Sequence, residues 1–396
     1  MERLGIRADA DSLKEEIIRL RRDIHMHPEL GNEEHRTAAL VEETLRGLGI
    51  ETRRIAGTGV VGILRGNAPG QTVALRADMD ALPIPEENEV AYASLAHGKM
   101  HACGHDMHTA GLLGAAVLLS RRRERLAGNV KFLFQPAEES SGGALPMIEG
   151  GALENPTVDA VFGLHCTPEL PTGTMGVAYG KAYAASDSFD VVIRGKACHG
   201  AVPQNGIDAI VVGAQVVSAL QTFVSRNMDP VDSAVVTIGK FNGGYQSNII
   251  ADRVELSGII RTLDSETRRK AIASVGNMIQ GVTVALGAAS EITFTEGYPP
   301  LINHRTMVDF VRKTAEEVLG PGKAVVLEKP TMTVEDFAYF LQKAPGAFFQ
   351  LGVRNEGKGL VHPLHSGRFD ADEDALPLAA AMHAQIALSF LRQSEG

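Results

Sequence analysis

The segment His101–His108, with the sequence HACGHDMH, is the richest local cluster of side chains that could carry out chemistry. Cys103 and His105 flank Gly104, and glycine permits a tight turn before the helix expected to follow. Thiolate and imidazole are good ligands for zinc-like transition metals, and carboxylates complete such sites. The same pair could instead be a cysteine nucleophile, Cys103, with His105 as its base. The cluster therefore indicates a metal centre or a nucleophilic hydrolase.

Two adjacent carboxylates, Glu138 and Glu139, add what metal-assisted hydrolysis requires. Neighbouring side chains point in different directions, so one can bind a metal while the other acts as a base on water. The metal lowers the pKa of water and polarises a carbonyl group. Taken alone, a Glu-Glu pair is usually part of a solvated face, so it has weight only beside the other residues.

Four candidate residues follow apolar segments that are expected to be strands. Asp78 follows residues 72–77, Glu138 and Glu139 follow residues 130–134, and His165 follows residues 158–164. In open α/β sheets, ligands bind at the carboxyl ends of strands, so these residues can meet in one cleft. Together they favour a metal centre over the ordinary structural roles that each could have alone.

The sequence pattern predicts the alternating strands and helices of an α/β fold in both terminal parts of the chain, where these residues lie. Apolar spacing predicts strands at residues 59–64, 72–77, 130–134, 158–164, 324–327 and 347–351. It predicts helices at residues 13–24, 38–48, 107–119, 307–319, 334–341 and 375–391. Continuous apolar strands between helices are typical of a mostly parallel sheet that is buried on both faces.

The middle of the chain has a different pattern. Strands are expected at residues 188–193, 234–238, 254–260 and 291–295, with helices at 207–224 and 268–286. The order β-α-β-β-α-β is that of a ferredoxin-like unit. We therefore expect a larger domain formed by residues 1–183 and 297–396, with residues 184–296 inserted into it as a second domain.

Composition restricts the classes of partner. The 396 residues are 44% hydrophobic with a formal net charge of −10, so no broad basic surface is expected for nucleic acid or an anionic membrane. No apolar run approaches the roughly 20 residues of a membrane span, and Met1–Leu20 is too polar for a signal peptide. Three cysteines without a framework pattern are expected to be reduced thiols, so the expected location is the cytoplasm.

Four motifs resemble the M20 family of metallopeptidases. They are RADMDALP at residues 76–83, MHACGHD at 100–106, QPAEE at 135–139 and HPLHS at 362–366. More narrowly they resemble its amidohydrolase branch, which contains hippurate hydrolases, N-acyl-amino-acid amidohydrolases and auxin-conjugate hydrolases. The resemblance runs through essentially the whole chain, in order. It implies a dinuclear metallohydrolase domain with an inserted lid and dimerisation domain.

The resemblance also implies roles for particular residues. Two divalent metal ions per subunit, of zinc, manganese, cobalt or nickel, would be held by Cys103, His105, Glu139, His165 and His365. Glu138 matches the general base, and Asp78 would orient the ligands. Arg76 stands where related members have a metal-binding histidine, and Cys103 where they have a bridging aspartate.

In the inserted domain, the resemblance implies a substrate-binding set. His199 would reach the active site of a partner subunit and polarise the scissile carbonyl group. Asn248 and Arg261 would hold the carboxylate of the substrate, which an arginine can bind in a bidentate manner. This implies a homodimer formed through the inserted domain, or a higher homo-oligomer.

The function expected from these features is metal-dependent hydrolysis of the amide bond of a small N-acyl amino acid. A small-peptide or other amide-conjugate hydrolase of the same mechanism is the alternative within the family. A cysteine hydrolase and a non-catalytic binding protein are the rivals outside it. A dinucleotide enzyme is disfavoured because no Gly-X-Gly-X-X-Gly motif follows the first strand.

Overall fold

The chain separates into two units in the computed structural model, which describes residues 3–392. Unit 1 comprises the described residues of Met1–Gly180, Asn303–Glu328 and Tyr339–Gly396, and unit 2 comprises Lys181–Ile302 and Lys329–Ala338. Residues 329–338, which the sequence pattern places in the larger domain, instead pair through their backbone with the first residues of unit 2. Ala184 donates to the Thr333 carbonyl oxygen, and Thr331 donates to that of Ala182.

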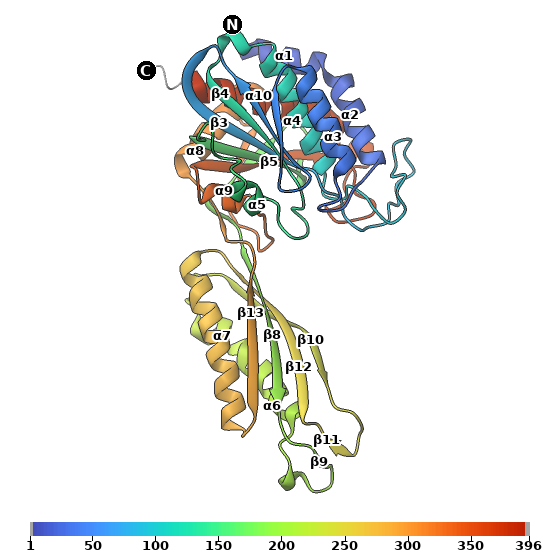
Figure 1. The fold of residues 1–396 in the computed structure, drawn as a ribbon, viewed down its shortest axis with the longest axis vertical. Helices are drawn as coiled ribbons and strands as arrows, with labels where there is room; N and C mark the ends of the chain where they lie inside the picture. The colour runs from blue at the N-terminus through green and yellow to red at the C-terminus, as the bar shows by residue number, and fades with distance from the viewer. Residues whose placement is uncertain (1–2, 393–396) are drawn as a thin grey trace. The chain divides into compact units, whose positions relative to one another are not determined.

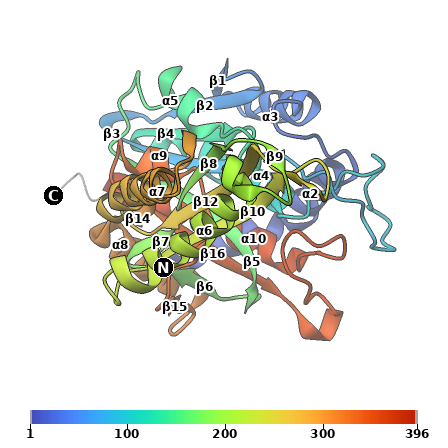
Figure 2. The ribbon, with the colours of Figure 1, turned by 90° about the horizontal axis from the view of Figure 1, so that it is seen from below.

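Unit 1 is built on an eight-stranded sheet. Its strands, in spatial order, are β1 (Glu51–Ile55), β2 (Gly59–Arg65), β4 (Ala127–Gln135), β3 (Ala68–Asp78), β5 (Ala160–Pro171), β16 (Gly346–Arg354), β6 (Met175–Val177) and β15 (Ala324–Val326). The four central strands, β4, β3, β5 and β16, pair in parallel, which confirms the predicted mostly parallel sheet. Antiparallel pairs lie toward the two edges of the sheet. Strands β1 and β2 form one edge, and β6 and β15 form the other (Figure 2).

Two almost wholly buried helices, α4 (His105–Ser120) and α10 (Leu376–Arg392), pack against each other and against β3. They approach closely because α4 carries glycines where it meets α10. A Cβ atom on Gly111 would lie 2.8 Å from the Ala379 Cβ, and one on Gly114 would lie 2.9 Å from the Ala380 Cβ. Helices that are apolar on every side must be covered on every side, and α1, α2 and α8 contribute to this cover (Figure 1).

The remaining helices of unit 1 are shorter or more amphipathic. The helices other than α4 and α10 are α1 (Arg3–Ser12), α2 (Lys14–Met26), α3 (His35–Gly47), α5 (Ala144–Glu149), α8 (Arg305–Leu319) and α9 (Ala338–Leu341). The helix predicted at residues 334–341 forms only as α9, and the backbone of Thr331 and Thr333 before it pairs with Ala182 and Ala184. Strand β1 is not predicted from the sequence, because its charged side chains lie at the edge of the sheet and lack an apolar pattern.

Unit 2 has the element order β-α-β-β-α-β. Its elements are β8 (Ala185–Arg194), α6 (Ala209–Thr222), β10 (Ala234–Gly243), β12 (Arg253–Thr262), α7 (Ser265–Ala285) and β13 (Ala289–Glu296). The strands form an antiparallel sheet in the order β10-β12-β8-β13. Buried side chains alternate along β8 and β12, because one face of the sheet packs under α6 and α7.

Two smaller sheets complete the strands. The strands β9 (Cys198–His199) and β11 (Ile249–Ile250) pair near the start of β12, as Figure 1 shows, and β7 (Gly180–Tyr183) pairs with β14 (Leu301–Asn303). The first residues of the segment Lys181–Ile302 and the last ones therefore lie in neighbouring strands.

Two helical stretches are long and apolar enough to cross a membrane by length and composition, although the sequence analysis expects none. They are Ala209–Asn227 and Glu373–Arg392. The second stretch is 89% buried in the structure, as the core helix of unit 1. Core helices pass the same test as membrane spans, so these stretches are weak evidence for a membrane.

Arg21, on α2, is fully buried and binds carboxylates from two distant segments. Its Nε donates to Asp106 Oδ2 at 2.7 Å, and its Nη2 donates to Asp370 Oδ1 at 2.7 Å. Asp106 follows His105 at the start of α4, and Asp370 lies on the loop that contains His365. Arg21 thereby ties together two segments that carry candidate metal ligands.

We predict that Arg21→Met lowers the free energy of unfolding by about 3–5 kcal/mol, because two buried carboxylates lose their cation. Denaturant unfolding, followed by circular dichroism, would measure the change. The control is Arg22→Met, whose exposed guanidinium pairs with Glu373 and whose loss should cost less than about 1 kcal/mol. Equal costs for the two variants would show that the buried network does not hold unit 1 together.

Candidate metal centre

The candidate residues of unit 1 gather where strands of the parallel core end. Asp78 is the last residue of β3, Glu138 and Glu139 follow β4, and His105 begins α4. His165 differs from the prediction, since it lies inside β5 rather than after it. Strand β5 continues because β16 pairs with it, matching Gln350 with His165 and Gly352 with Thr167.

The structure brings all five predicted ligands into one continuous cluster. Three overlapping groups of potential ligand atoms consist of unit 1 residues alone, each within 4.8 Å: Cys103, Glu139 and His365; His105, Glu138 and Glu139; and Asp78, His105, His108 and His165. The Cys103 Sγ also lies 3.5 Å from the His165 Nε2, which joins the first group to the third. These residues come from distant segments of the sequence, so the folded parallel sheet creates the cluster.

His105 is oriented for a ligand that the protein does not supply. Its Nδ1 lies 3.1 Å from the Asp80 Oδ1, which fixes the ring. Its buried Nε2 has no hydrogen-bond partner within the described part of the chain. That nitrogen instead faces the Asp78 Oδ2 at 3.7 Å and the Glu139 Oε1 at 4.0 Å. A buried polar atom without a partner is costly, and a cation between these groups would remove the cost.

The charges around Glu139 are strongly coupled. Burial acts to raise the pKa of Glu139, but the His365 hydrogen bond and the nearby His105 lower it to about 2. Burial acts to lower the pKa of His105, but Asp78, Asp80 and Glu139 raise it to about 10. The carboxylates therefore provide a negative environment that holds a proton on His105 and would equally attract a metal cation.

The other donors also fit a transition metal. Burial, with Glu139 and Glu138 nearby, raises the pKa of the Cys103 thiol well above its usual value. Burial, together with His108, lowers the pKa of His165 to about 3, so that imidazole is neutral and available as a ligand. A set of sulfur, imidazole and carboxylate donors suits zinc-like metals better than magnesium or calcium.

Asp78 has fixed partners of its own. Its Oδ2 accepts from Arg76 at 2.6 Å, and its Oδ1 lies 2.5 Å from the His108 Nδ1. The His108 Nε2 accepts from the Cys166 backbone N–H at 2.8 Å, so the Nδ1 carries the proton that goes to Asp78. With both nitrogens engaged, His108 positions Asp78 and the backbone beside His165.

Asp80 is the carboxylate that orients His105, and sequence reasoning missed it. Asp80 binds the ring through Oδ1, and its Oδ2 accepts from the Glu139 backbone N–H at 2.9 Å. Asp78, predicted to orient the ligands, makes its short contact with His108 instead. The available signal was the pattern Asp78-Met79-Asp80, because side chains two residues apart in an extended segment point to the same side.

Two positions at the site have left-handed backbone conformations. Gly104 has a φ of 79°, and a Cβ atom there would lie 2.2 Å from the Cys166 Sγ, so both conformation and space require glycine. His365 has a φ of 61°, which is strained for a residue with a side chain. Its backbone N–H donates to the Ala102 carbonyl oxygen at 2.8 Å. The hydrogen bond ties the His365 loop to the segment that carries Cys103.

The predicted residues of unit 2 lie in two separate places. His199 is exposed on β9, and the Asn248 carbonyl oxygen accepts from the Gly200 N–H at 2.7 Å, so these two segments are adjacent. Arg261 lies near the opposite end of β12, where it pairs with Ser186, and is half-buried. The structure therefore brings the His199 and Asn248 segments together but does not bring Arg261 to them.

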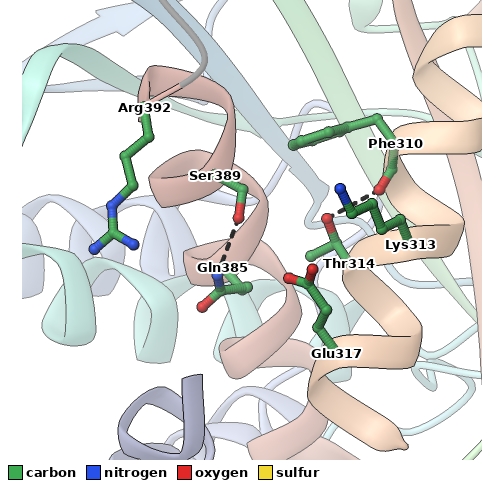
Figure 3. Close-up of a pocket in the computed structure, with 7 residues that line it drawn as sticks. All are labelled: Phe310, Lys313, Thr314, Glu317, Gln385, Ser389 and Arg392. Atoms are coloured by element: carbon green, nitrogen blue, oxygen red, sulfur yellow. Dashed lines mark hydrogen bonds between the residues drawn. The ribbon is translucent and has the colours of Figure 1, made fainter. Parts of the chain in front are cut away.

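A separate hollow lies between α8 and α10 (Figure 3). Its volume is about 180 Å³, and its walls include Phe310, Lys313, Gln385 and Arg392. It contains none of the predicted site residues.

Comparison with known proteins gives consistent matches. The model of peptidase family M20/M25/M40 matches residues 74–389. Thermostable carboxypeptidase 2 of Saccharolobus solfataricus is 43% identical, covering 97% of this chain and 98% of that protein. An N-acetyl-L-cysteine deacetylase of Bacillus subtilis is 40% identical, covering 97% of this chain and 90% of that protein.

A solved structure agrees with these matches. The YXEP protein of Bacillus subtilis, a dinuclear metal binding peptidase from the M20 family, superimposes with a TM-score of 0.85 at 35% sequence identity. The match covers 96% of this chain and 99% of the other. The expected family is therefore confirmed: the chain belongs to peptidase family M20/M25/M40 and is a metal-dependent hydrolase of amide bonds.

Proposed function

We propose that this protein hydrolyses the amide bond of small N-acyl amino acids, releasing a carboxylic acid and a free amino acid. The observation that carries the proposal is the placement of Glu138, which is 8% exposed and grouped with Glu139 and His105. A carboxylate beside a ligand cluster is what a general base for metal-assisted hydrolysis requires. The similar N-acetyl-L-cysteine deacetylase supports an N-acyl amino acid as the substrate class.

In the proposed reaction, Cys103, His105, Glu139, His165 and His365 hold two divalent ions, of zinc, manganese, cobalt or nickel. Bound metal ions would lower the pKa of the attacking water and polarise the amide carbonyl group. Glu138 removes a proton from that water and then delivers it to the leaving amine. Asp80 keeps the His105 ring in place, and Arg76 and His108 keep Asp78 ionised and fixed.

Unit 2 would act as the lid and dimerisation domain. His199 and Asn248 would both reach the active site of a partner subunit, where His199 would stabilise the oxyanion. Asn248 and Arg261, which lie far apart within one unit 2, would bind the substrate carboxylate from opposite subunits. The edge strand β10 supports a homodimer, because sheet edges are available for pairing. Apolar side chains are exposed on and near this edge, with Phe241 40% and Tyr245 69% exposed.

Peptide hydrolysis is the second candidate function. The similar thermostable carboxypeptidase supports it, since a peptide with a free carboxyl end has the same amide and carboxylate groups as an N-acyl amino acid. A panel containing N-acetyl, N-benzoyl and indolylacetyl amino acids beside dipeptides, assayed on metal-reconstituted protein, separates the two. Higher kcat/KM for the dipeptides throughout would replace the proposal with the second candidate.

A cysteine nucleophile is less consistent with the structure. A reactive thiol needs a lowered pKa, whereas burial and the carboxylates of Glu139 and Glu138 raise that of Cys103. Its grouping with Glu139 and His365 suits a ligand instead.

We predict that chelation abolishes hydrolysis, that divalent metal restores it, and that metal affinity rises with pH. The free site holds protons on His105, with a pKa of about 10, and on the Cys103 thiol, and both must leave when a metal binds. Reconstitution titrations between about pH 6.5 and 8.5 should show affinity rising by up to roughly tenfold per pH unit for each proton released. Full activity in protein shown by elemental analysis to be free of metal would contradict the proposal.

We predict that Glu138→Gln lowers kcat by roughly a hundredfold or more, because the amide cannot accept a proton from water. Metal content, measured by elemental analysis, should stay at the wild-type value. Glu139→Gln is the matched control, since it should lose metal. If Glu138→Gln loses metal and Glu139→Gln keeps it, the roles of the two residues are exchanged.

We predict that subunits carrying His199→Ala complement subunits carrying Glu138→Gln. Each variant alone should be nearly inactive, whereas a mixed dimer would contain one intact site. Random exchange makes half of the dimers mixed, so equal amounts should recover roughly a quarter of wild-type activity. Mixed dimers that form but recover no activity would show that His199 does not act in the partner's site.

A further inference from the structure

Glu34 is a fully buried carboxylate directly before helix α3, but its side chain does not cap that helix. A carboxylate at the start of a helix usually accepts from the first free N–H groups. Here Glu29 accepts from the backbone N–H groups of Arg36 and Thr37 at 2.9 and 2.8 Å. The Glu34 side chain makes no such cap.

The Glu34 carboxylate instead crosses to the segment that carries Glu138. Its Oε1 accepts from the Ala137 backbone N–H at 2.8 Å, and its Oε2 accepts from the Thr58 hydroxyl at 2.5 Å. Both bonds are buried, and a carboxylate bonded to an N–H group in such surroundings makes a strong hydrogen bond. Burying a carboxylate is costly, so this contact with one backbone group far along the chain calls for an explanation.

Ala137 has a left-handed backbone conformation, with a φ of 56°, directly before Glu138. A residue with a side chain adopts this conformation only where its surroundings enforce it. The Ala137 carbonyl oxygen accepts from the Gly142 N–H at 2.9 Å, and its N–H is held by Glu34. Relaxation of Ala137 to an ordinary conformation would rotate the peptide that follows and turn Glu138 in a new direction.

A second carboxylate holds the other side of Glu138. The Glu139 N–H donates to the Asp80 Oδ2, and the Asp80 Oδ1 contacts His105. The residues before and after Glu138 are thus each fixed through their N–H groups by a buried carboxylate.

We propose that Glu34 is a positioning residue for Glu138: through the Ala137 N–H it maintains the left-handed turn that aims the base. The proposal rests on the proposed function, in which Glu138 is the general base. Small displacements of a reacting group reduce rate more than binding, so loss of Glu34 lowers kcat and leaves KM and metal content nearly unchanged.

The test compares Glu34→Ala, Glu34→Gln and Glu29→Ala, each loaded with metal and assayed on an N-acetyl amino acid that the wild type hydrolyses. We expect Glu34→Ala to lower kcat by about tenfold or more, with KM changed less than about threefold. Glu34→Gln should recover most of the activity, because its amide oxygen still accepts from Ala137. Glu29→Ala is the matched control, since it removes a carboxylate from the start of the same helix without touching Ala137.

Hydrogen exchange at the Ala137 amide gives a readout that does not depend on activity. Exchange should be faster in Glu34→Ala and unchanged in Glu29→Ala. If Glu34→Ala does not fold, Glu34→Asp decides, because it keeps the charge but its shorter side chain withdraws the carboxylate from the Ala137 N–H. A fall in its kcat at full metal content supports the proposal, and an unchanged kcat overturns it.

Equal losses of kcat in Glu34→Ala and Glu29→Ala, or a loss that follows metal content, would also overturn the proposal. Glu138→Gln, measured beside these variants, separates this failure from a wrong general base. If Glu138→Gln keeps the wild-type kcat, the proposed function fails whatever Glu34→Ala does. If Glu138→Gln is impaired while Glu34→Ala behaves like Glu29→Ala, only the positioning role fails.

Discussion

The need to pair every buried charge is the constraint on which unit 1 depends. Ionisable groups that leave water are tolerated only with opposite charges or hydrogen bonds in place. Arg76 and His108 bind Asp78, Arg21 and His25 bind the Oδ2 of Asp106, and Asp80 contacts His105. The buried His105 Nε2 has no hydrogen-bond partner among the described residues, and it faces the carboxylates of Asp78 and Glu139. A cation fits beside this nitrogen. The paired groups around it hold the candidate ligands in separate positions.

This pairing also explains why the site is connected to the core rather than carried on free loops. Helix α4 begins at the candidate ligand His105 and is packed against α10, with glycines at the closest approach. Arg21 links the start of that helix to the loop that carries His365. Displacement of one ligand would therefore disturb the packing of several elements, and the positions of the ligands are set by the stability of the whole unit.

The sequence predicts the parallel core because apolar strands are local patterns, and short motifs predict the candidate ligands that the structure places in one cluster. The sequence does not predict that Asp80 orients His105 or that Glu34 contacts Ala137. Each of these side chains could bind several polar groups, and only the folded chain determines which of them lies within reach. The helix expected at residues 334–341 is wrong over its first half. Its apolar spacing is suitable, but the backbone of Thr331 and Thr333 just before it pairs with unit 2. The continuation of β5 past His165 likewise depends on the partner strand β16.

The geometry within unit 2 restricts how its residues can serve one substrate. His199 and Asn248 lie near the start of β12, and Arg261 lies near its end. From Arg253 to Arg261 the strand spans about 26 Å at roughly 3.3 Å per residue. A small N-acyl amino acid is far shorter than this distance. If His199 and Arg261 both act on one such molecule, they must therefore come from different copies of unit 2, because the sheet that separates them is hydrogen-bonded along its whole length. On that condition a complete site would exist only in the proposed dimer, with His199 and Arg261 supplied by opposite subunits.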